Sequence, residues 1–455
     1  MFITRREKTE QYEVRCPRQP VHWEVEVPGS KSITNRALLL SALGEEAVRL
    51  TGVLFSDDTW FFVEALRDLG IFVEASEEKR QMIVSGCAGL IPHGRARITA
   101  GSSGTTARFL TAVLGVSDGT YEIAALPQME ERPMQPLFEA LGALGAQITW
   151  EGAEWHLPVR LTGAGSQSDW VKVQPRAMPE EERSERHPVS MEMDISESTQ
   201  FLSAFLMAAP LFPDGARIRI TSEKKDGPYI RMTRQMMEDF GVNVCFEEDA
   251  YLLPVDARYQ CEAYHVEPDV SAACYFYAAA AVTGGYVRVN GIHKDSLQGD
   301  LAFLDVLSRM GCDVREEEDG IAVTGPASGA LHGVTVDMRD FSDQALTLAA
   351  IAPYADAPTE IKNVAHIRQQ ESDRIQAIVT NLRRAGISCE ETPDGVRIEP
   401  GRPTSCAIET FDDHRVAMAF AIMGLGADGI VIEDPACCRK TFKQFFKILD
   451  QLCSE

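Results

Sequence analysis

The chain has 455 residues, of which 45% are hydrophobic and 25% are charged, a composition typical of a globular protein long enough for two domains. Its formal net charge of -24 argues against the broad basic surface that non-specific binding to nucleic acid or to a membrane requires. An anionic ligand would therefore need a locally basic site in an acidic protein.

The cysteines and the apolar runs indicate in which cellular compartment the protein is expected. The eleven cysteines are scattered between Cys16 and Cys453 without a C-x-x-C pair, so they predict reduced thiols rather than a disulfide framework or a zinc site. The charged first 15 residues lack the apolar core of a signal peptide, and no apolar run approaches the roughly 20 residues of a membrane span. We therefore expect a soluble, cytoplasmic protein.

The first predicted helix begins near Lys31, in the stretch VPGSKSITNRALLL (residues 27–40). This stretch resembles a phosphate-binding loop, but the glycine that a Walker loop requires five residues before Gly-Lys-Ser is missing. The spacing excludes a nucleotide loop. A serine and a lysine at a helix start still suit an anion, because the first N–H groups of a helix have no partner within it.

Two kinds of helix then alternate along the chain. Unusually apolar helices are predicted to begin near Lys31, Gly104, Thr199, Ser271, Ser342 and His414, at separations of 73, 95, 72, 71 and 72 residues. Each is followed by an amphipathic helix and usually by a glycine and an alternating strand. The amphipathic helices are expected within residues 58–74, 132–149, 227–244, 299–314, 372–389 and 440–452. The regular spacing predicts six copies of one α/β unit.

Six units divide naturally into two domains of three. We predict one domain over residues 28–266 and a second domain formed by residues 1–27 and 267–455, with the crossover close to residue 266. The single long separation places an insertion at about 165–188, which is polar and dense in charge. We interpret this insertion as a surface excursion of the first domain.

Polar motifs recur at the starts of the predicted helices, including PGSKS, SGTTAR, ERPM, SESTQ, FSDQ, ESDR and DDHR. Some of them, such as FSDQ and SESTQ, are explained as ordinary helix N-caps. N-capping does not explain the cations at several starts, where the helix dipole disfavours positive charge. These cations are Lys31, Arg36, Arg108, Arg132, Arg374, Arg415 and Lys440. We expect them to converge on acidic small molecules in a cleft between the domains.

The motifs PGSKSITNRALLL, SGTTAR, ERPM, STQF, PYI, ESDR and DDHR, in this order, resemble the 5-enolpyruvylshikimate-3-phosphate (EPSP) synthase family from about residue 22 to the end. The resemblance implies a two-domain inverse α/β barrel in which each domain has three βαβαββ units. It also implies transfer of an enolpyruvyl group from phosphoenolpyruvate to the 5-hydroxyl of shikimate 3-phosphate, with release of phosphate and without a cofactor or a metal. Closure of the cleft on its ligands is expected.

The resemblance also implies roles for individual residues. Lys31, Asp343 and Glu371 match the catalytic residues. Shikimate 3-phosphate is expected to contact Lys31, Ser32, Arg36, Ser198, Thr199, Gln200 and Asp343. Phosphoenolpyruvate is expected to contact Lys31, Gly104, Arg132, Gln200, Arg374, Arg415 and Lys440, and glyphosate is expected to inhibit at the same subsite. Arg108 and Tyr229 are weaker candidates, each with an equally good structural explanation, and a lone histidine such as His414 is more often a hydrogen-bonded support.

The chain departs from the family pattern at three positions. Gln370 stands where a lysine usually precedes the ESDR motif, Ser102 replaces an asparagine, and Asp226 replaces a serine that often contacts phosphate. Two alternatives stay open at this point: an enolpyruvyl transferase acting on UDP-N-acetylglucosamine, and a catalytically silent anion-binding protein. We expect small-molecule partners only and a monomeric chain.

Overall fold

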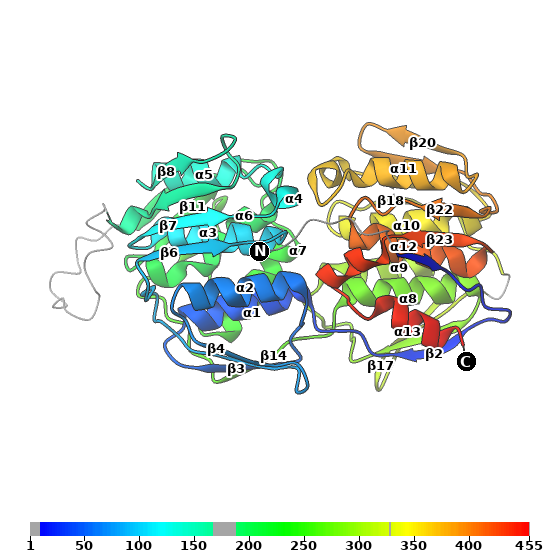
Figure 1. The fold of residues 1–455 in the computed structure, drawn as a ribbon, viewed down its shortest axis with the longest axis horizontal. Helices are drawn as coiled ribbons and strands as arrows, with labels where there is room; N and C mark the ends of the chain where they lie inside the picture. The colour runs from blue at the N-terminus through cyan, green and yellow to red at the C-terminus, as the bar shows by residue number, and fades with distance from the viewer. Residues whose placement is uncertain (1–9, 167–187, 327–328, 455) are drawn as a thin grey trace. The chain divides into compact units, whose positions relative to one another are not determined.

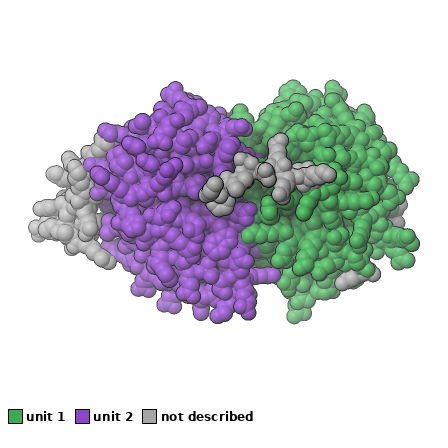
Figure 2. All heavy atoms as spheres, viewed as in Figure 1, with its two compact units in different colours: residues 1–28, 267–455 green, residues 29–266 purple. Residues whose placement is uncertain are grey.

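The computed structural model describes residues 10–166, 188–326 and 329–454. The chain divides into two compact units (Figures 1 and 2). Unit 2 is the continuous segment Gly29–Val266, and unit 1 consists of Met1–Pro28 together with Glu267–Glu455. Most of the insertion that the sequence places at about 165–188 lies outside the described residues.

Each unit contains three small sheets built on one plan. A parallel pair of strands is joined to an antiparallel hairpin, so that a four-stranded sheet has the order typified by β6-β7-β9-β8. Among the described residues five sheets have four strands and the sheet β1-β23-β22 has three. Among the described residues, a helix connects the two parallel strands in four of the six sheets, and a second helix precedes the hairpin of each four-stranded sheet, which confirms the repeated α/β unit predicted from the spacing.

Strands that are distant in sequence complete three of the sheets, one in unit 2 and two in unit 1, where the sheet β1-β23-β22 is one of them. In unit 2, β14 (Ala263–His265) pairs in parallel with β3, and in unit 1, β2 (His22–Val25) pairs in parallel with β15. The other strands of unit 2 are β3 (Val48–Thr51), β4 (Val73–Ser76), β5 (Gln81–Val84), β6 (Arg95–Thr99), β7 (Thr120–Ala124), β8 (Gln147–Trp150), β9 (Val159–Thr162), β10 (Val189–Met193), β11 (Ala216–Ile220), β12 (Cys245–Glu247) and β13 (Ala250–Leu253).

The remaining strands of unit 1 complete its three sheets. They are β1 (Gln11–Glu13), β15 (Tyr286–Asn290), β16 (Asp313–Glu317), β17 (Gly320–Thr324), β18 (Thr335–Asp337), β19 (Thr359–Lys362), β20 (Cys389–Thr392), β21 (Gly395–Ile398), β22 (Cys406–Ile408) and β23 (Ile430–Glu433).

The helices, which are labelled in Figure 1, fall into the apolar and amphipathic kinds expected from the sequence. The apolar helices are α1 (Lys31–Leu43), α3 (Gly104–Val116), α6 (Thr199–Met207), α8 (Val270–Thr283), α10 (Ala345–Ile351) and α12 (His414–Met423). The others are α2 (Asp57–Asp68), α4 (Pro127–Glu130), α5 (Gln135–Ala143), α7 (Pro228–Asp239), α9 (Ala302–Arg309), α11 (Arg374–Arg384) and α13 (Phe445–Leu452).

The apolar helices form the centre of each unit. In unit 1, α8, α10 and α12 contact one another, and in unit 2, α3 contacts both α1 and α6. Helix α8 shows why such a helix is central, because every residue from Ala272 to Ala281 is buried and no polar face remains for solvent. The helices therefore pack inside, and the N-terminal turns of α1, α6 and α12 carry some of the polar residues of the predicted site.

Five of the amphipathic helices stop at a glycine, as predicted. Gly70, Gly145, Gly241, Gly311 and Gly386 all have φ between 78° and 98°, in the left-handed region that favours glycine. The glycine turns the chain from the helix into the following strand. In the part of the chain that the structure describes, no helix combines the length and the apolar character that crossing a bilayer demands.

Candidate active site

Lys31 is the first residue of α1, where the sequence predicts a proton-relaying cation. Its Nζ lies 3.2 Å from Oδ2 of Asp58, which belongs to the first turn of α2. Only 2% of the Asp58 side chain is exposed, so a buried carboxylate holds the ammonium group at the start of α1. Motif reasoning missed Asp58, because an acidic residue in the first turn of a helix is also a common stabilising feature.

Arg36 lies on the following turn of α1 and is fully buried. Its guanidinium donates hydrogen bonds to Oγ1 of Thr233 (2.8 Å) and to the carbonyl of Ser32 (3.0 Å). The same group lies over the rings of Phe109 and Tyr229, and burial lowers the pKa of Arg36 to about 10. In this structure Arg36 braces α1 against α7, and its contact with shikimate 3-phosphate stays a prediction.

Two guanidinium groups gather at the start of α3. A Cβ on Gly104, the first residue of this helix, would lie 2.7 Å from Nη1 of Arg132 and 3.0 Å from Nη1 of Arg108. Nη1 of Arg108 also donates to Oε1 of Gln200 at 2.7 Å. Burial and then the charge of Arg132 lower the pKa of Arg108. Two crowded cations at a helix N-terminus form an electrostatic environment that favours a bound anion.

Ser198, Thr199 and Gln200 occupy the start of α6, as the sequence predicts. Oγ of Ser198 accepts the backbone N–H of Gln200 at 3.3 Å and so caps the helix. The ammonium of Lys224 approaches the same region, since a Cβ on Gly227 would lie 3.5 Å from it and 3.4 Å from the Thr199 methyl group. The sequence analysis did not identify Lys224, because no motif includes it.

The carboxylate of Asp226 is paired in the structure. It lies 2.7 Å from Nη1 of Arg231 and accepts the Tyr251 hydroxyl at 3.2 Å. The charge that replaces the family's serine at this position is therefore compensated by an arginine one turn along α7.

In unit 1, Asp343 lies between two arginines. Its Oδ1 is 2.9 Å from Nη1 of Arg374 and its Oδ2 is 3.0 Å from Nη2 of Arg415. Asp343 comes from the turn η6 (Ser342–Gln344) before α10, and the arginines come from the first turns of α11 and α12. Three helix starts therefore bring together one carboxylate and two cations that the sequence predicts as site residues.

Asp413 holds Arg374 and the start of α12 in this arrangement. Its Oδ2 lies 2.9 Å from Nε of the buried Arg374, and its Oδ1 accepts the backbone N–H of Arg415 at 2.9 Å. Burial alone would raise the pKa of Asp413, but the Arg374 guanidinium lowers it overall. Gln370 accepts a hydrogen bond from Arg374 as well, so the residue that replaces the usual lysine also orients an arginine.

Glu371 lies between two potentially cationic groups. Its Oε2 is 2.9 Å from Nδ1 of His414 and 3.1 Å from Nζ of Lys440. A carboxylate held in this way can exchange a proton with a nearby carbon or oxygen while the ammonium group stabilises its charged form. Asp373, two residues on, instead caps α11 and pairs with Arg368, so it braces an arginine.

Glu371, Asp413 and His414 are close enough in space to be tested as metal ligands. One possible ligand atom of each lies within 4.8 Å of the others. Lys440 and Arg374 already bring positive charge to Glu371 and Asp413, and this charge disfavours a metal cation. The cluster is therefore better suited to proton transfer than to metal binding.

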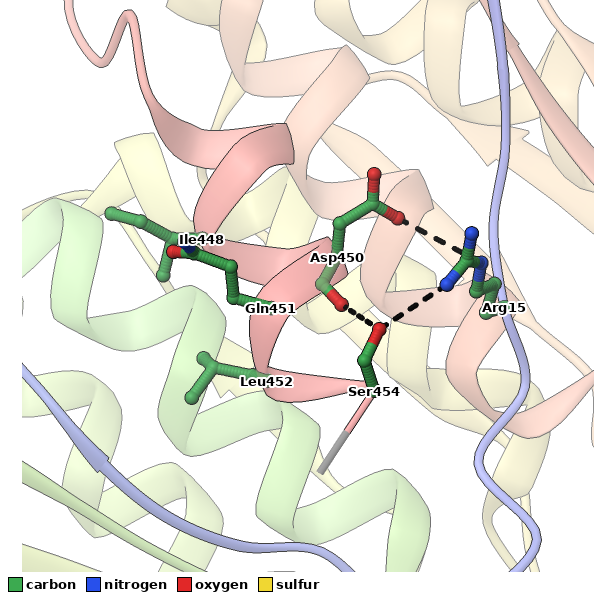
Figure 3. A pocket seen from close by; sticks show the side chains of 6 residues that line it. All are labelled: Arg15, Ile448, Asp450, Gln451, Leu452 and Ser454. Atoms are coloured by element: carbon green, nitrogen blue, oxygen red, sulfur yellow. Dashed lines mark hydrogen bonds and ion pairs between the residues drawn. The ribbon is translucent and has the colours of Figure 1, made fainter.

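A separate hollow of about 620 Å³ lies at the last helix, α13 (Figure 3). Arg15 reaches across it to Ser454 at 3.2 Å and to Asp450 at 4.0 Å. None of the predicted site residues lines it, and the Arg15 and Asp450 side chains are 65% and 44% exposed. We assign no part of the predicted chemistry to this hollow.

Comparisons with known proteins agree with these motifs. The model of a family described as EPSP synthase (3-phosphoshikimate 1-carboxyvinyltransferase) matches residues 16–449. The 3-phosphoshikimate 1-carboxyvinyltransferase of Nostoc punctiforme is 41% identical over 444 residues, covering 96% of this chain and 99% of the relative. The enzyme of the same name from Trichormus variabilis is 43% identical over 438 residues, covering 95% and 98%.

Solved structures show the same fold. The EPSP synthase of Acinetobacter baumannii superposes with a TM-score of 0.77 over 98% of both chains at 24% sequence identity. The predicted two-domain inverse α/β barrel is confirmed by this likeness.

Proposed function

Because the chain belongs to the EPSP synthase family, we propose that it transfers the enolpyruvyl group of phosphoenolpyruvate to the 5-hydroxyl of shikimate 3-phosphate and releases phosphate. The observation that carries this proposal is the family match over residues 16–449, which includes every predicted site residue. The comparisons favour this acceptor over UDP-N-acetylglucosamine, because the matching relatives carry the name of the shikimate enzyme.

The proposed reaction is an addition followed by an elimination. The acceptor hydroxyl loses its proton as its oxygen bonds to the second carbon of phosphoenolpyruvate, and the methylene carbon gains a proton. The resulting tetrahedral intermediate then loses a proton from its methyl group and expels phosphate. Each half therefore needs one group that accepts a proton and one that donates a proton, at the reacting oxygen and at the methylene carbon.

We assign these proton transfers to three residues. Asp343 accepts the hydroxyl proton, and Glu371 exchanges the proton at the methylene carbon. Lys31 stabilises the oxygen anions and serves the leaving phosphate. The contacts of Glu371 with Lys440 and His414 support this assignment, because neighbouring groups that can donate a proton let a carboxylate change its protonation state during turnover.

Two sets of cations would bind the two acidic groups of phosphoenolpyruvate. Arg108 and Arg132 at the start of α3 would bind one acidic group of phosphoenolpyruvate, and the crowding of their charges supports this role. Arg374, Arg415 and Lys440 would bind a second acidic group, since a planar guanidinium can hold two oxygens at once. Ser198, Thr199 and Gln200 would hold shikimate 3-phosphate at the start of α6.

The proposal requires groups from both units, because Lys31 belongs to unit 2 whereas Asp343 and Glu371 belong to unit 1. A single chain supplies all of them, so the monomeric state predicted from the sequence is compatible with the chemistry. Substitutions in either unit should therefore impair the same reaction.

An assay of phosphate release tests the proposal. The protein should release phosphate only when shikimate 3-phosphate and phosphoenolpyruvate are both present, and Glu371→Gln should suppress the release. Binding of both compounds without phosphate release would instead indicate a silent homologue. Release that depends on UDP-N-acetylglucosamine would indicate the other transferase.

A further inference from the structure

Asp300 is a buried carboxylate that the predicted chemistry does not use. It lies in the turn η5 (Gly299–Leu301) before α9 and is 7% exposed. Its carboxylate accepts hydrogen bonds from the hydroxyl of Ser271 and from Nε2 of Gln344 (2.8 Å). Both donors are neutral, and within residues 10–166, 188–326 and 329–454 no cation forms a direct ion pair with Asp300. Burying a charged carboxylate without a paired cation costs free energy of folding, so the position of Asp300 calls for an explanation.

Both hydrogen-bond donors lead directly to Asp343. Gln344 is the next residue along the chain and closes the turn Ser342–Gln344 that carries Asp343. Ser271 accepts a long hydrogen bond of 3.5 Å from Nη2 of Arg415, the same nitrogen that lies 3.0 Å from Oδ2 of Asp343. Asp300 is thus connected to Asp343 once through the backbone and once through an arginine.

We propose that Asp300 is a positioning residue that fixes the orientation of Asp343 and, through its own negative charge, strengthens Asp343 as a base. The proposal rests on the proposed function, in which Asp343 accepts the proton of the acceptor hydroxyl. The negative charge of Asp300 makes it harder for Asp343 to remain ionised, so a proton binds Asp343 more tightly.

The groups around Asp300 define how this effect depends on pH. Burial and then the nearby Asp343 raise the pKa of Asp300 to about 6, while Arg415 and the two hydrogen bonds oppose this rise. On α8, Cys274 and Asp269 also face this region. Below about pH 6 Asp300 gains a proton, so it loses its negative charge and one of its oxygens becomes a donor. The two hydrogen bonds that hold Ser271 and Gln344 are then weakened.

The test compares three variants across pH. The parent's kcat should decrease as the pH falls through about 6. In Asp300→Asn, kcat at pH 8 should be about tenfold lower than in the parent, and no further decrease near pH 6 should occur. Ser271→Ala keeps the charge but cuts the link to Arg415, so kcat should fall and the decrease near pH 6 should remain. Asp305→Asn removes an exposed carboxylate on α9 and should match the parent.

A measurement without turnover separates this inference from the proposed function. In protein labelled with carboxyl-¹³C aspartate, the Asp343 signal is assigned by its loss in Asp343→Asn. Its titration should move to lower pH in Asp300→Asn, whether or not the protein transfers enolpyruvyl groups. An unchanged titration would overturn the inference, as would an unchanged kcat profile in an active protein. If Asp300→Asn does not fold, an unchanged kcat and an unchanged Asp343 titration in Ser271→Ala would overturn it.

Discussion

The guanidinium of Arg132 lies where a side chain on Gly104 would have to be placed, because a Cβ there would be 2.7 Å from Nη1. Gly104 does not have a left-handed φ, whereas Gly101, three residues earlier, has φ +60°. The two glycines are therefore required for different reasons. Gly104 leaves space for the arginines, and Gly101 makes the turn.

Gly104→Ala should fold normally and lose affinity for phosphoenolpyruvate. The methyl group would displace Arg132, and a weakened charge-assisted hydrogen bond of about 1.5 kcal/mol corresponds to a roughly tenfold rise in the KM for phosphoenolpyruvate. Inhibition by glyphosate, a longer molecule, should weaken more. Inhibition curves and thermal melts measure both effects, and unchanged inhibition would contradict the role given to Gly104.

Gly101→Ala serves as the contrasting variant. A side chain at this position would have a left-handed φ and would collide with the ring of Phe61. We expect a loss of stability of about 1–3 kcal/mol. Equal effects of the two alanine substitutions on stability would show that Gly104 is also conformationally required.

Glu371→Gln should retain the binding of both substrates and lose most of the turnover. The amide keeps the shape of the side chain but cannot exchange the proton, and groups of this kind contribute about 10²–10⁴-fold in rate. Rapid kinetics together with equilibrium binding separate the two effects. Glu390→Gln, at an exposed position on β20, is the control, and a Glu371→Gln variant within twofold of the parent would remove Glu371 from the mechanism.

Arg374→Met should destabilise unit 1 by about 3–5 kcal/mol, because it leaves the buried Asp413 without its guanidinium partner. The pKa of Asp413 is lowered in the folded protein, so its stabilisation is present above its unfolded pKa and is lost as the pH falls through the folded pKa. The difference between parent and variant should therefore shrink in acid. Urea unfolding of parent and variant at several pH values measures this difference. Arg368→Met is the control: it removes a more exposed ion pair, so it should lower the free energy of unfolding much less.

The stability that Asp300 contributes should depend on pH in the direction opposite to that of Asp413. Its folded pKa of about 6 lies above the unfolded value, so the stability it contributes is present in acid and is lost as the pH rises through about 6. Asp300→Asn stays neutral and avoids this loss. Relative to the parent, the free energy of unfolding of the variant should rise by up to about 3 kcal/mol between pH 4 and pH 8. A difference independent of pH would contradict the raised pKa.

The sequence was sufficient for the repeated architecture because the fold depends on strong local signals. Apolar helices at a spacing near 72 residues, each followed by an amphipathic helix and a glycine, define the unit without tertiary information. The positions of the cations followed from the motifs at helix starts.

The acidic partners were harder to predict, because they come from positions distant in sequence. Asp58 contacts Lys31 across 27 residues, and Asp300 lies 44 residues from Gln344, whose amide it binds. Each is an aspartate near the start of a helix, where capping is an equally good explanation. Only the packed structure distinguishes a capping carboxylate from one that holds a residue of the proposed site.

The central claim is that this chain transfers an enolpyruvyl group to shikimate 3-phosphate. NMR analysis of one reaction tests it most directly, with limiting phosphoenolpyruvate and equal amounts of shikimate 3-phosphate and UDP-N-acetylglucosamine. We expect phosphoenolpyruvate to be consumed with formation of one enolpyruvyl ether, on the 5-oxygen of shikimate 3-phosphate, and one equivalent of phosphate. Unconsumed phosphoenolpyruvate, or an enolpyruvyl ether on the sugar nucleotide, would contradict the claim.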